Sequence, residues 1–211
     1  GPALSIVGTE PSAAIGNEGL AVVALFLLMG AFATEAGVSA DMYRLAYAVV
    51  GHFRGGLAMA TIGGCAGFGA ICGSSIATTA TMAKIALPEM LERNYQQTLA
   101  SGSIAAGGTL GMLVPPSVVM IIYGILTEES IIALFAAAIV PGIIATVLYV
   151  ITIGIYVRLF PESGPAGDQV PWWDKLVILK QSWRFLLIAV VVSGGIYSGI
   201  FTPTEAAAVS V

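Results

Sequence analysis

Residues 69–81 read Gly69-Ala70-Ile71-Cys72-Gly73-Ser74-Ser75-Ile76-Ala77-Thr78-Thr79-Ala80-Thr81, a run of glycines and hydroxyls inside an otherwise apolar sequence. Such a run makes a poor core helix, because glycine costs about 1 kcal/mol relative to alanine in a helix interior. Within a bilayer, non-helical backbone is tolerated only where it is buried in protein or lines a water-filled cavity. The stretch is therefore either a seam of close helix packing or the tip of a re-entrant loop that binds something small.

The composition indicates an all-α integral membrane protein. Of the 211 residues 57% are hydrophobic and 9% are charged, whereas soluble domains carry about 25% charged residues. The net charge of −4 therefore says little about partners. We expect Cys65 and Cys72 to pack as small apolar side chains rather than to bind metal or to bridge each other. The chain lacks an initiator Met and ends in an apolar run, so we expect it to be part of a longer protein.

The first 54 residues predict one membrane span and one helix at the interface. Residues 1–18 are rich in turn formers, and residues 19–37 are apolar over about the 20 residues that a crossing needs. We expect Ser39 to cap a short amphipathic helix that runs to Val50 along the interface. The single histidine, His52, follows in a charged break, and we expect it to be an interfacial polar residue rather than a proton relay.

Residues 56–90 are too many for one crossing, because a continuous helix would run about 50 Å against a hydrocarbon core of roughly 30 Å. We predict a re-entrant hairpin whose half-helices, 57–72 and 76–91, meet at Cys72-Gly73-Ser74-Ser75. The second half-helix would point its positive N-terminal end into the bilayer, which suits an anion. Carbonyls and hydroxyls at the tip suit an alkali cation. A packing face of small residues on ordinary helices is the alternative.

A second interruption follows in the next apolar segment. The run Gly107-Gly108-Thr109-Leu110-Gly111 precedes Pro115-Pro116-Ser117 about halfway along residues 97–126. Two prolines remove two N–H donors and disfavour helical geometry at the residues before them, so we predict a broken helix. Paired interruptions in neighbouring membrane segments are typical of a transporter binding site near the bilayer midplane.

The remaining sequence predicts a polar turn at 127–130, a long span over 131–160, a loop over 161–171, an interfacial helix over 172–184 and a span over 185–200. We expect Thr202 to cap a further helix that begins at Pro203. With residues 56–90 as a hairpin, every Lys and Arg lies on the cytoplasmic side and the glutamates at 10, 18, 128, 129 and 205 lie outside. A single crossing would separate Arg54 from Arg93, so the positive-inside rule favours the hairpin.

The motifs together resemble the large membrane subunit of the tripartite ATP-independent periplasmic (TRAP) transporters, the DctM-like proteins. The resemblance extends over nearly the whole chain and about the first half of such a subunit. The residues that carry it are Gly69-x-x-x-Gly73-Ser74-Ser75-x-Ala77-Thr78, Leu87-Pro88-Glu89-Met90, Gly107-Gly108-Thr109-Leu110-Gly111, Pro115-Pro116-Ser117, Tyr123-Gly124 and the run from Gly199 to Ala208. Cys72 departs from the family, which more often has Ser there, and we expect its side chain to point away from the site.

The resemblance implies an elevator-type transporter built from two inverted repeats, of which this chain holds the first. It divides the chain into an N-terminal span with an interfacial helix (1–54), a transport-type core with the hairpin and broken helix (55–126), a long span, interfacial helix and further span (127–200), and the start of the second repeat (201–211). The implied protein is a multi-pass component of the bacterial inner membrane. It is a sodium-coupled secondary transporter of organic acids, such as C4-dicarboxylates, and not an enzyme.

The resemblance also implies partners and site residues. A periplasmic substrate-binding protein would deliver the organic acid, and a small membrane subunit would be separate or fused; no nucleic acid and no cofactor other than the coupling sodium ion is expected. Position by position, the implied substrate-site residues are Gly73, Ser74, Ser75, Thr78, Pro115, Pro116 and Ser117. The implied sodium-site residues are Gly73, Ser74, Ser75, Gly107, Gly108 and Thr109.

Two other classes of function are weaker alternatives. An intramembrane serine protease could use Ser74 or Ser75, but His52 lies at an interface and no carboxylate lies deep enough to serve as a base. The other alternative is a passive channel or a membrane assembly subunit that does not transport.

Overall fold

A computed structural model describes residues 18–167 and 171–210, which form helices and one isolated antiparallel bridge between Arg54 and Ala166, with no strand in those ranges. The predicted all-α fold is confirmed for these residues. Residues 1–17, including Glu10 and most of the predicted turn-rich segment, lie outside them. The elements are α2 Glu18–Glu35, α3 Val38–Val50, α4 Gly56–Cys72, α5 Ser75–Glu92, α6 Gln97–Leu113, α7 Val118–Thr127, α8 Ile131–Leu159, η1 Pro161–Ser163, α9 Trp172–Gln181, α10 Trp183–Ala189, the π-helical η2 Val190–Gly194, α11 Gly195–Tyr197 and α12 Pro203–Ser210.

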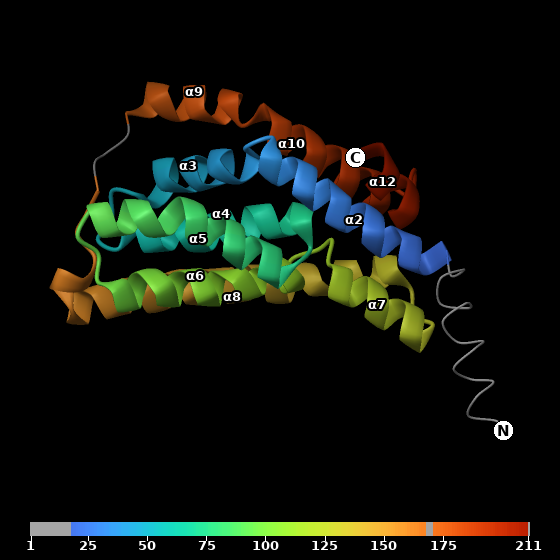
Figure 1. Cartoon of the computed structure of the whole chain (residues 1–211), viewed down its shortest axis with the longest axis horizontal. Coiled ribbons are helices and arrows are strands. Elements are labelled where there is room, and N and C mark those ends of the chain that lie inside the picture. Colours follow the sequence, from blue (N-terminus) through green and yellow to red (C-terminus); the bar gives the residue numbers. More distant parts are fainter. Residues whose placement is uncertain (1–17, 168–170, 211) are drawn as a thin grey trace.

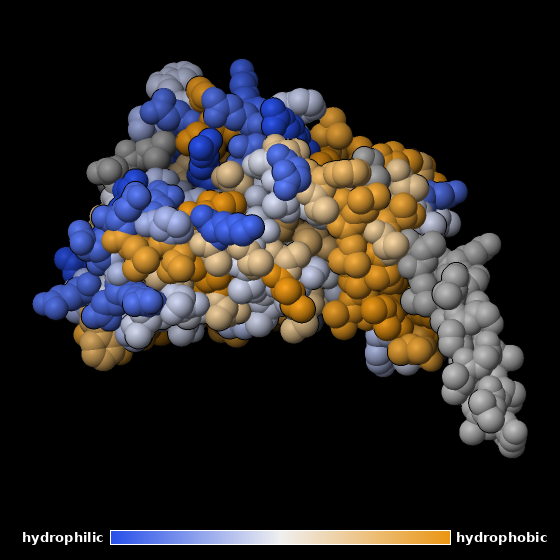
Figure 2. All heavy atoms as spheres, viewed as in Figure 1, coloured by the Kyte–Doolittle hydropathy of each residue, from blue (hydrophilic) through white to orange (hydrophobic). Residues whose placement is uncertain are grey.

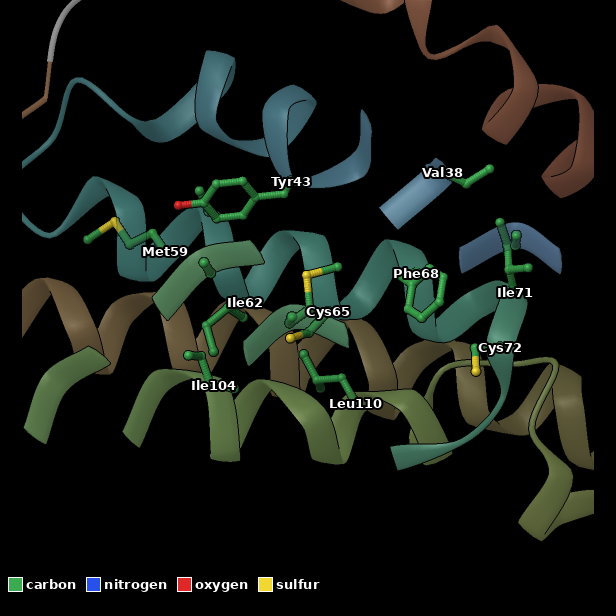
Figure 3. Close-up of a cluster of buried hydrophobic side chains, with 14 of the residues drawn as sticks. Val38, Tyr43, Met59, Ile62, Cys65, Phe68, Ile71, Cys72, Ile104 and Leu110 are labelled. Atoms are coloured by element: carbon green, nitrogen blue, oxygen red, sulfur yellow. The ribbon is translucent and has the colours of Figure 1, made fainter. Parts of the chain in front are cut away.

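Helix α4 lies at the centre of the molecule (Figure 1). It packs against α2, α3, α5, α6 and α8, and most of its residues are buried. A helix that is apolar on every side has no solvent face to present, so its sequence favours this central position. Figure 3 shows side chains of α4, among them Ile62, Cys65 and Phe68, between Tyr43 of α3 and Leu110 of α6.

One described helix, α8, is long and apolar enough to cross a bilayer by itself, and the number rises to four if each bent helix pair forms one span. The bent pairs are α2 with α3, at 68°, α6 with α7, at 40°, and α9 with the helix from Trp183 to Tyr197, at 57°. Few residues of α8 are buried although nearly all are apolar. In water such a surface would be unfavourable, so its exposed face is suited to lipid or to another membrane segment.

The predicted two-helix hairpin and broken helix are both present. The hairpin legs α4 and α5 agree with the predicted ranges to within one residue at each end, and the helical segment from Gln97 to Thr127 is interrupted between Leu113 and Val118. The long span and the helices that follow it also occur, although Ser182 separates α9 from α10. Thr202 caps α12 as predicted, because its hydroxyl accepts from the Glu205 N–H at 3.3 Å while the Glu205 carboxylate accepts from the Thr202 N–H at 2.8 Å.

The predicted cap of α3 is wrong. Gly37, in a left-handed conformation with φ of 78°, is the N-cap, and Ser39 lies inside the first turn with its side chain buried. Gly37 is the residue that tolerates this φ at the sharp change of direction from α2 to α3. A serine close to a helix start therefore misled the prediction, because the glycine two residues earlier begins the helix without a side-chain hydrogen bond.

The two ends of the molecule differ in polarity. Figure 2 shows hydrophilic side chains gathered on the left of this face and hydrophobic ones on the right, over the region where α2 lies in Figure 1. The left end holds the open end of the hairpin, where Arg54 pairs with Ala166 in the bridge and Tyr95 bonds to Pro165. Arg54 and Arg158 also line one cavity there.

Candidate functional site

The hairpin tip consists of two residues, Gly73 and Ser74. Gly73 has φ of 63° and donates its N–H to the Gly69 carbonyl at 2.8 Å, which ends α4. Glycine is the residue that adopts this left-handed conformation without strain. Ser74 is extended and caps α5, its Oγ accepting from the Ala77 N–H at 3.4 Å. The sequence thus ends one helix and starts the next with no further linker.

The interruption between α6 and α7 is likewise formed by residues that end one helix and begin the next. Helix α6 ends at Leu113, and α7 begins at Val118 after the buried Pro115, Pro116 and Ser117. The Pro115–Pro116 peptide bond is cis. The Ser117 Oγ donates to the Met112 carbonyl at 2.6 Å, so this hydroxyl satisfies one of the carbonyls that the interrupted helix leaves without an N–H partner.

The tip and the break are in direct contact. The Val118 N–H donates to the Gly73 carbonyl at 3.1 Å, and a Cβ at Gly73 would lie 3.0 Å from the Pro116 carbonyl oxygen. Four helix ends therefore meet here: the C-termini of α4 and α6, which present carbonyls, and the N-termini of α5 and α7, which present N–H groups. Carbonyl ends attract cations and N–H ends attract anions, so one small region can bind both.

Glycines let the hairpin helices α4 and α5 pack closely against α6, and we call this line of contact the seam. A Cβ at Gly69 would lie 2.6 Å from the Gly111 Cα, and a Cβ at Gly111 would lie 2.9 Å from the Ser74 carbonyl oxygen. Further from the tip, Gly107 faces Cys65 and Gly108 faces Thr79 at similarly close range. Residues 69–81 thus form a packing seam as well as the turn of a helical hairpin. That the turn re-enters the membrane and binds a small molecule stays a prediction.

Thr78 carries a polar atom that the protein leaves without a partner. Its side chain is 0% exposed, and its hydroxyl has no hydrogen-bond partner. It points at Gly111, where a Cβ would lie 2.5 Å from the Thr78 Oγ1. A buried hydroxyl without a hydrogen bond lowers the free energy of unfolding by roughly 1–3 kcal/mol. The Thr78 hydroxyl therefore destabilises the fold unless a ligand binds to it.

The predicted residues lie in three places rather than in one site. Gly73, Ser74, Thr78 and Pro115 to Ser117 lie at the contact of tip and break, whereas Gly107 and Gly108 lie along the seam. Thr109 faces outward, donating to the Ala106 carbonyl at 2.7 Å and lying 3.2 Å from the Tyr149 hydroxyl. Ser75 and Thr109 line one open groove of about 440 Å³ between α5 and α6.

Sequence reasoning missed two contributors to this region. Gly111 was part of the quoted glycine pattern, but only the fold shows that it meets Gly69 and Thr78. Tyr149 of α8 contacts Thr109 from 40 residues away, and no local signal distinguishes it from other tyrosines of an apolar span. The expectation for Cys72 holds only in part, because its buried Sγ packs against Gly30 of α2 but also contacts the backbone N–H of Ser74 at the tip.

The donors available at the tip are neutral oxygens. Over residues 18–167 and 171–210, no group of three or more His, Cys, Asp or Glu side chains could hold a metal ion. His52 stacks against Phe53 with ring centroids 3.9 Å apart. Uncharged carbonyl and hydroxyl oxygens suit hard cations such as alkali ions better than transition metals.

Comparison with known proteins agrees with this arrangement. Residues 2–211 match the family described as "Tripartite ATP-independent periplasmic transporter, DctM component". The C4-dicarboxylate TRAP transporter large permease protein DctM of Vibrio cholerae is 39% identical over 206 residues, which is 98% of this chain and 45% of that protein. The protein of that name from Pseudomonas aeruginosa is 42% identical over 191 residues, 90% of this chain and 44% of its own. The sialic acid TRAP transporter large permease protein SiaM of Vibrio cholerae is 34% identical over 197 residues, 93% of this chain and 45% of its own.

The chain spans about half the length of the curated relatives it matches. The family and these relatives are membrane permease components of transporters and not enzymes, which confirms that expectation and leaves the protease alternative without support. The interrupted helices, the apolar spans and the match over almost every residue lead to one conclusion. The chain belongs to the DctM component family of the tripartite ATP-independent periplasmic transporters.

Proposed function

We propose that this chain forms the first half of a sodium-coupled permease that takes up an organic acid across a bacterial inner membrane. The observation that carries the proposal is the meeting of four helix ends at Gly73 and Val118. The names of similar proteins include permeases for C4-dicarboxylates, ectoine, sialic acid and isethionate. A carboxylate group on such a substrate suits the N-termini of α5 and α7, because these ends present N–H groups to an anion.

The coupling ion is proposed to bind on the carbonyl side of the same region. The carbonyls at the end of α4 and the Ser74 and Thr78 hydroxyls supply neutral oxygens. The Ser74 hydroxyl has oxygen lone pairs to spare, because it accepts only one long bond, of 3.4 Å, from Ala77. Of the residues implied by the family, Gly107 and Gly108 lie on α6 away from the tip and set how closely α6 approaches, whereas Thr109 faces outward.

The proposed partners follow from the family. A periplasmic binding protein delivers the organic acid, and a small membrane subunit accompanies the permease, separate or fused. This chain covers only 29% of the isethionate permease DctMQ and 31% of the sialic acid permease SiaT, against 45% of the Vibrio cholerae DctM protein, and the greater length of those two proteins is compatible with a fused subunit. An elevator movement of the hairpin and broken helix is the proposed route by which the site reaches both sides of the membrane.

Uptake by proteoliposomes tests the proposal. The complete natural chain, reconstituted with its small subunit and binding protein, should accumulate a carboxylate substrate only with an inward sodium gradient. Ser74→Ala should raise the sodium concentration for half-maximal uptake about tenfold, the loss expected from one strong oxygen ligand. Thr109→Ala, which lies outside the tip, should change it less. Flux without sodium coupling would contradict the proposal and favour a passive channel.

A further inference from the structure

Residues 161–167, which follow α8, cross the open end of the hairpin, and we call this segment the strap. Its backbone forms hydrogen bonds with the residues just before α4, the first leg of the hairpin. The Gly55 N–H donates to the Gly164 carbonyl at 3.0 Å, and the Gly167 N–H donates to the Gly51 carbonyl at 3.1 Å. Ala166 forms the isolated bridge with Arg54.

The strap also bonds to the chain just after the second leg. The Gln96 N–H donates to the Ser163 carbonyl at 3.0 Å, and the Ser163 hydroxyl donates to the Gln96 Oε1 at 2.9 Å. Ser163 is 0% exposed. The strap fits closely, because a Cβ at Gly164 would lie 3.1 Å from both the Gly55 Cα and the Tyr95 Cε1. The two ends of the hairpin are therefore held together by a third segment from elsewhere in the sequence.

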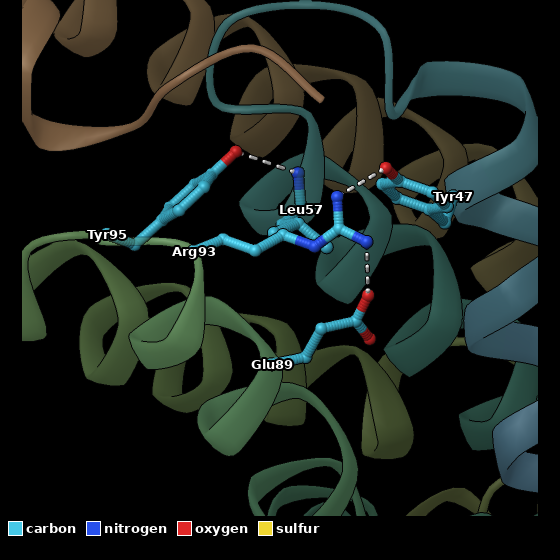
Figure 4. A network of polar contacts seen from close by, with 5 residues as sticks. All are labelled: Tyr47, Leu57, Glu89, Arg93 and Tyr95. Atoms are coloured by element: carbon cyan, nitrogen blue, oxygen red, sulfur yellow. Dashed lines mark hydrogen bonds and ion pairs between the residues drawn. The ribbon is translucent and has the colours of Figure 1, made fainter. Parts of the chain in front are cut away.

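Tyr95, which follows the second leg, connects the strap to the first leg through its hydroxyl. It donates to the Pro165 carbonyl at 2.8 Å. It also accepts from the Leu57 N–H at 3.2 Å (Figure 4). Leu57 lies in the first turn of α4, where N–H groups have no partner within the helix. Burial raises the pKa of the Tyr95 phenol, so the hydroxyl keeps its proton and remains a donor. Figure 4 also shows Arg93 between Tyr47 and Glu89, which ties the end of α5 to α3.

We propose that Tyr95, acting through the strap, is a positioning residue that holds the open ends of α4 and α5 at a fixed separation and so maintains the geometry of the tip. Each leg is about 26 Å long at 1.5 Å per residue. Only Gly73 and Ser74 join the legs, so a change in the angle between them must be absorbed by the backbone of these two residues. That change would turn the carbonyls that end α4 away from the Ser74 and Thr78 hydroxyls. This inference rests on the proposed sodium site at the tip.

The first test measures how uptake depends on sodium. Tyr95→Phe removes both hydrogen bonds and keeps the ring, so it should raise the sodium concentration for half-maximal uptake about three- to tenfold with little change in the maximal rate. Gly164→Val, which pushes the strap outward, should act in the same direction. The matched controls are Tyr156→Phe, whose ring packs on Phe160, and Gly102→Val, where a Cβ meets nothing within 4 Å. Both controls should behave as the unmodified protein.

A disulfide provides the rescue. In the Tyr95→Phe protein, Gln96→Cys with Ser163→Cys places two thiols where the strap meets the second leg, and the native cysteines are buried. Oxidation should return the sodium dependence to its original value, and reduction should undo the effect. A residue that supports only folding would not respond in this reversible way. An unchanged sodium dependence in Tyr95→Phe, or inhibition on oxidation, would overturn the proposal.

A second readout does not depend on transport. Spin labels on the exposed residues Phe53 and Glu92 report the separation of the two legs. Tyr95→Phe should broaden their distance distribution, and the disulfide should narrow it again. If the unmodified protein shows no sodium dependence, the proposed function fails, and the label distances alone then decide the role of Tyr95. A distribution that Tyr95→Phe leaves unchanged would refute that role.

Discussion

At the scale of single residues, Thr78 is the most informative position in the chain. Membrane helices commonly bond a Thr hydroxyl to the carbonyl one turn earlier, as Thr61 and Thr79 do here. Thr78 is as fully buried as Thr61, yet its hydroxyl makes no such bond. The Thr78 hydroxyl is therefore an unsatisfied polar atom beside the tip, and we interpret it as a ligand of the proposed coupling ion.

Thr78→Val separates stability from function. Valine has the same shape without the hydroxyl, so the variant should unfold at equal or higher temperature in detergent, with a gain of about 1 kcal/mol. It should also need more sodium for half-maximal uptake. Thr61→Val is the control, because it removes a satisfied hydroxyl from α4 and should lower stability without changing the sodium dependence. A Thr78→Val protein with lower stability and ordinary sodium dependence would show that the hydroxyl serves packing alone.

At the scale of elements, the two interrupted helices were predictable and their mutual fit was not. Gly73-Ser74-Ser75 and Pro115-Pro116 break helices through local backbone chemistry, which a sequence displays directly. The contact of Gly69 with Gly111 depends on how α4 and α6 lie against each other. A glycine pattern shows that close approach is allowed, but it does not say which helix approaches. For the same reason residues 161–171 were predicted only as a loop, whereas part of that loop is the strap.

Gly69→Ala tests whether close approach of α4 and α6 matters. The added methyl would lie 2.6 Å from the Gly111 Cα, and backbone cannot move aside as a flexible side chain can. Overpacking of this kind typically costs about 1–3 kcal/mol, so the melting temperature in detergent should fall. Gly102→Ala on the exposed face of α6 adds the same methyl where nothing lies within 4 Å, and it should be neutral or slightly stabilising. Equal effects of both substitutions would contradict the importance of the seam.

At the scale of the whole molecule, the hairpin makes the chain return to the end from which it entered. The strap contacts residues on both sides of the hairpin, at Gly55 and at Gln96, so these positions share one end of the fold. Helix α7 lies at the other end (Figure 1). The distribution of Lys and Arg in the sequence predicts the same arrangement, because the positive-inside rule acts over the whole chain. The placement of these ends in a membrane remains a prediction.

Cysteine labelling in sealed vesicles checks that placement. Arg54→Cys and Arg93→Cys should react with a membrane-impermeant thiol reagent from the same side, and Glu128→Cys, at the end of α7, should react from the opposite side. The native Cys65 and Cys72 are buried and should stay unlabelled in each variant. Arg54 and the bonded Arg93 are both near the open end of the hairpin, so a membrane that separated them would have to cut through the strap and the Tyr95 hydrogen bonds. Labelling of positions 54 and 93 from opposite sides would therefore refute the re-entrant topology, and with it the position of the four helix ends inside the bilayer.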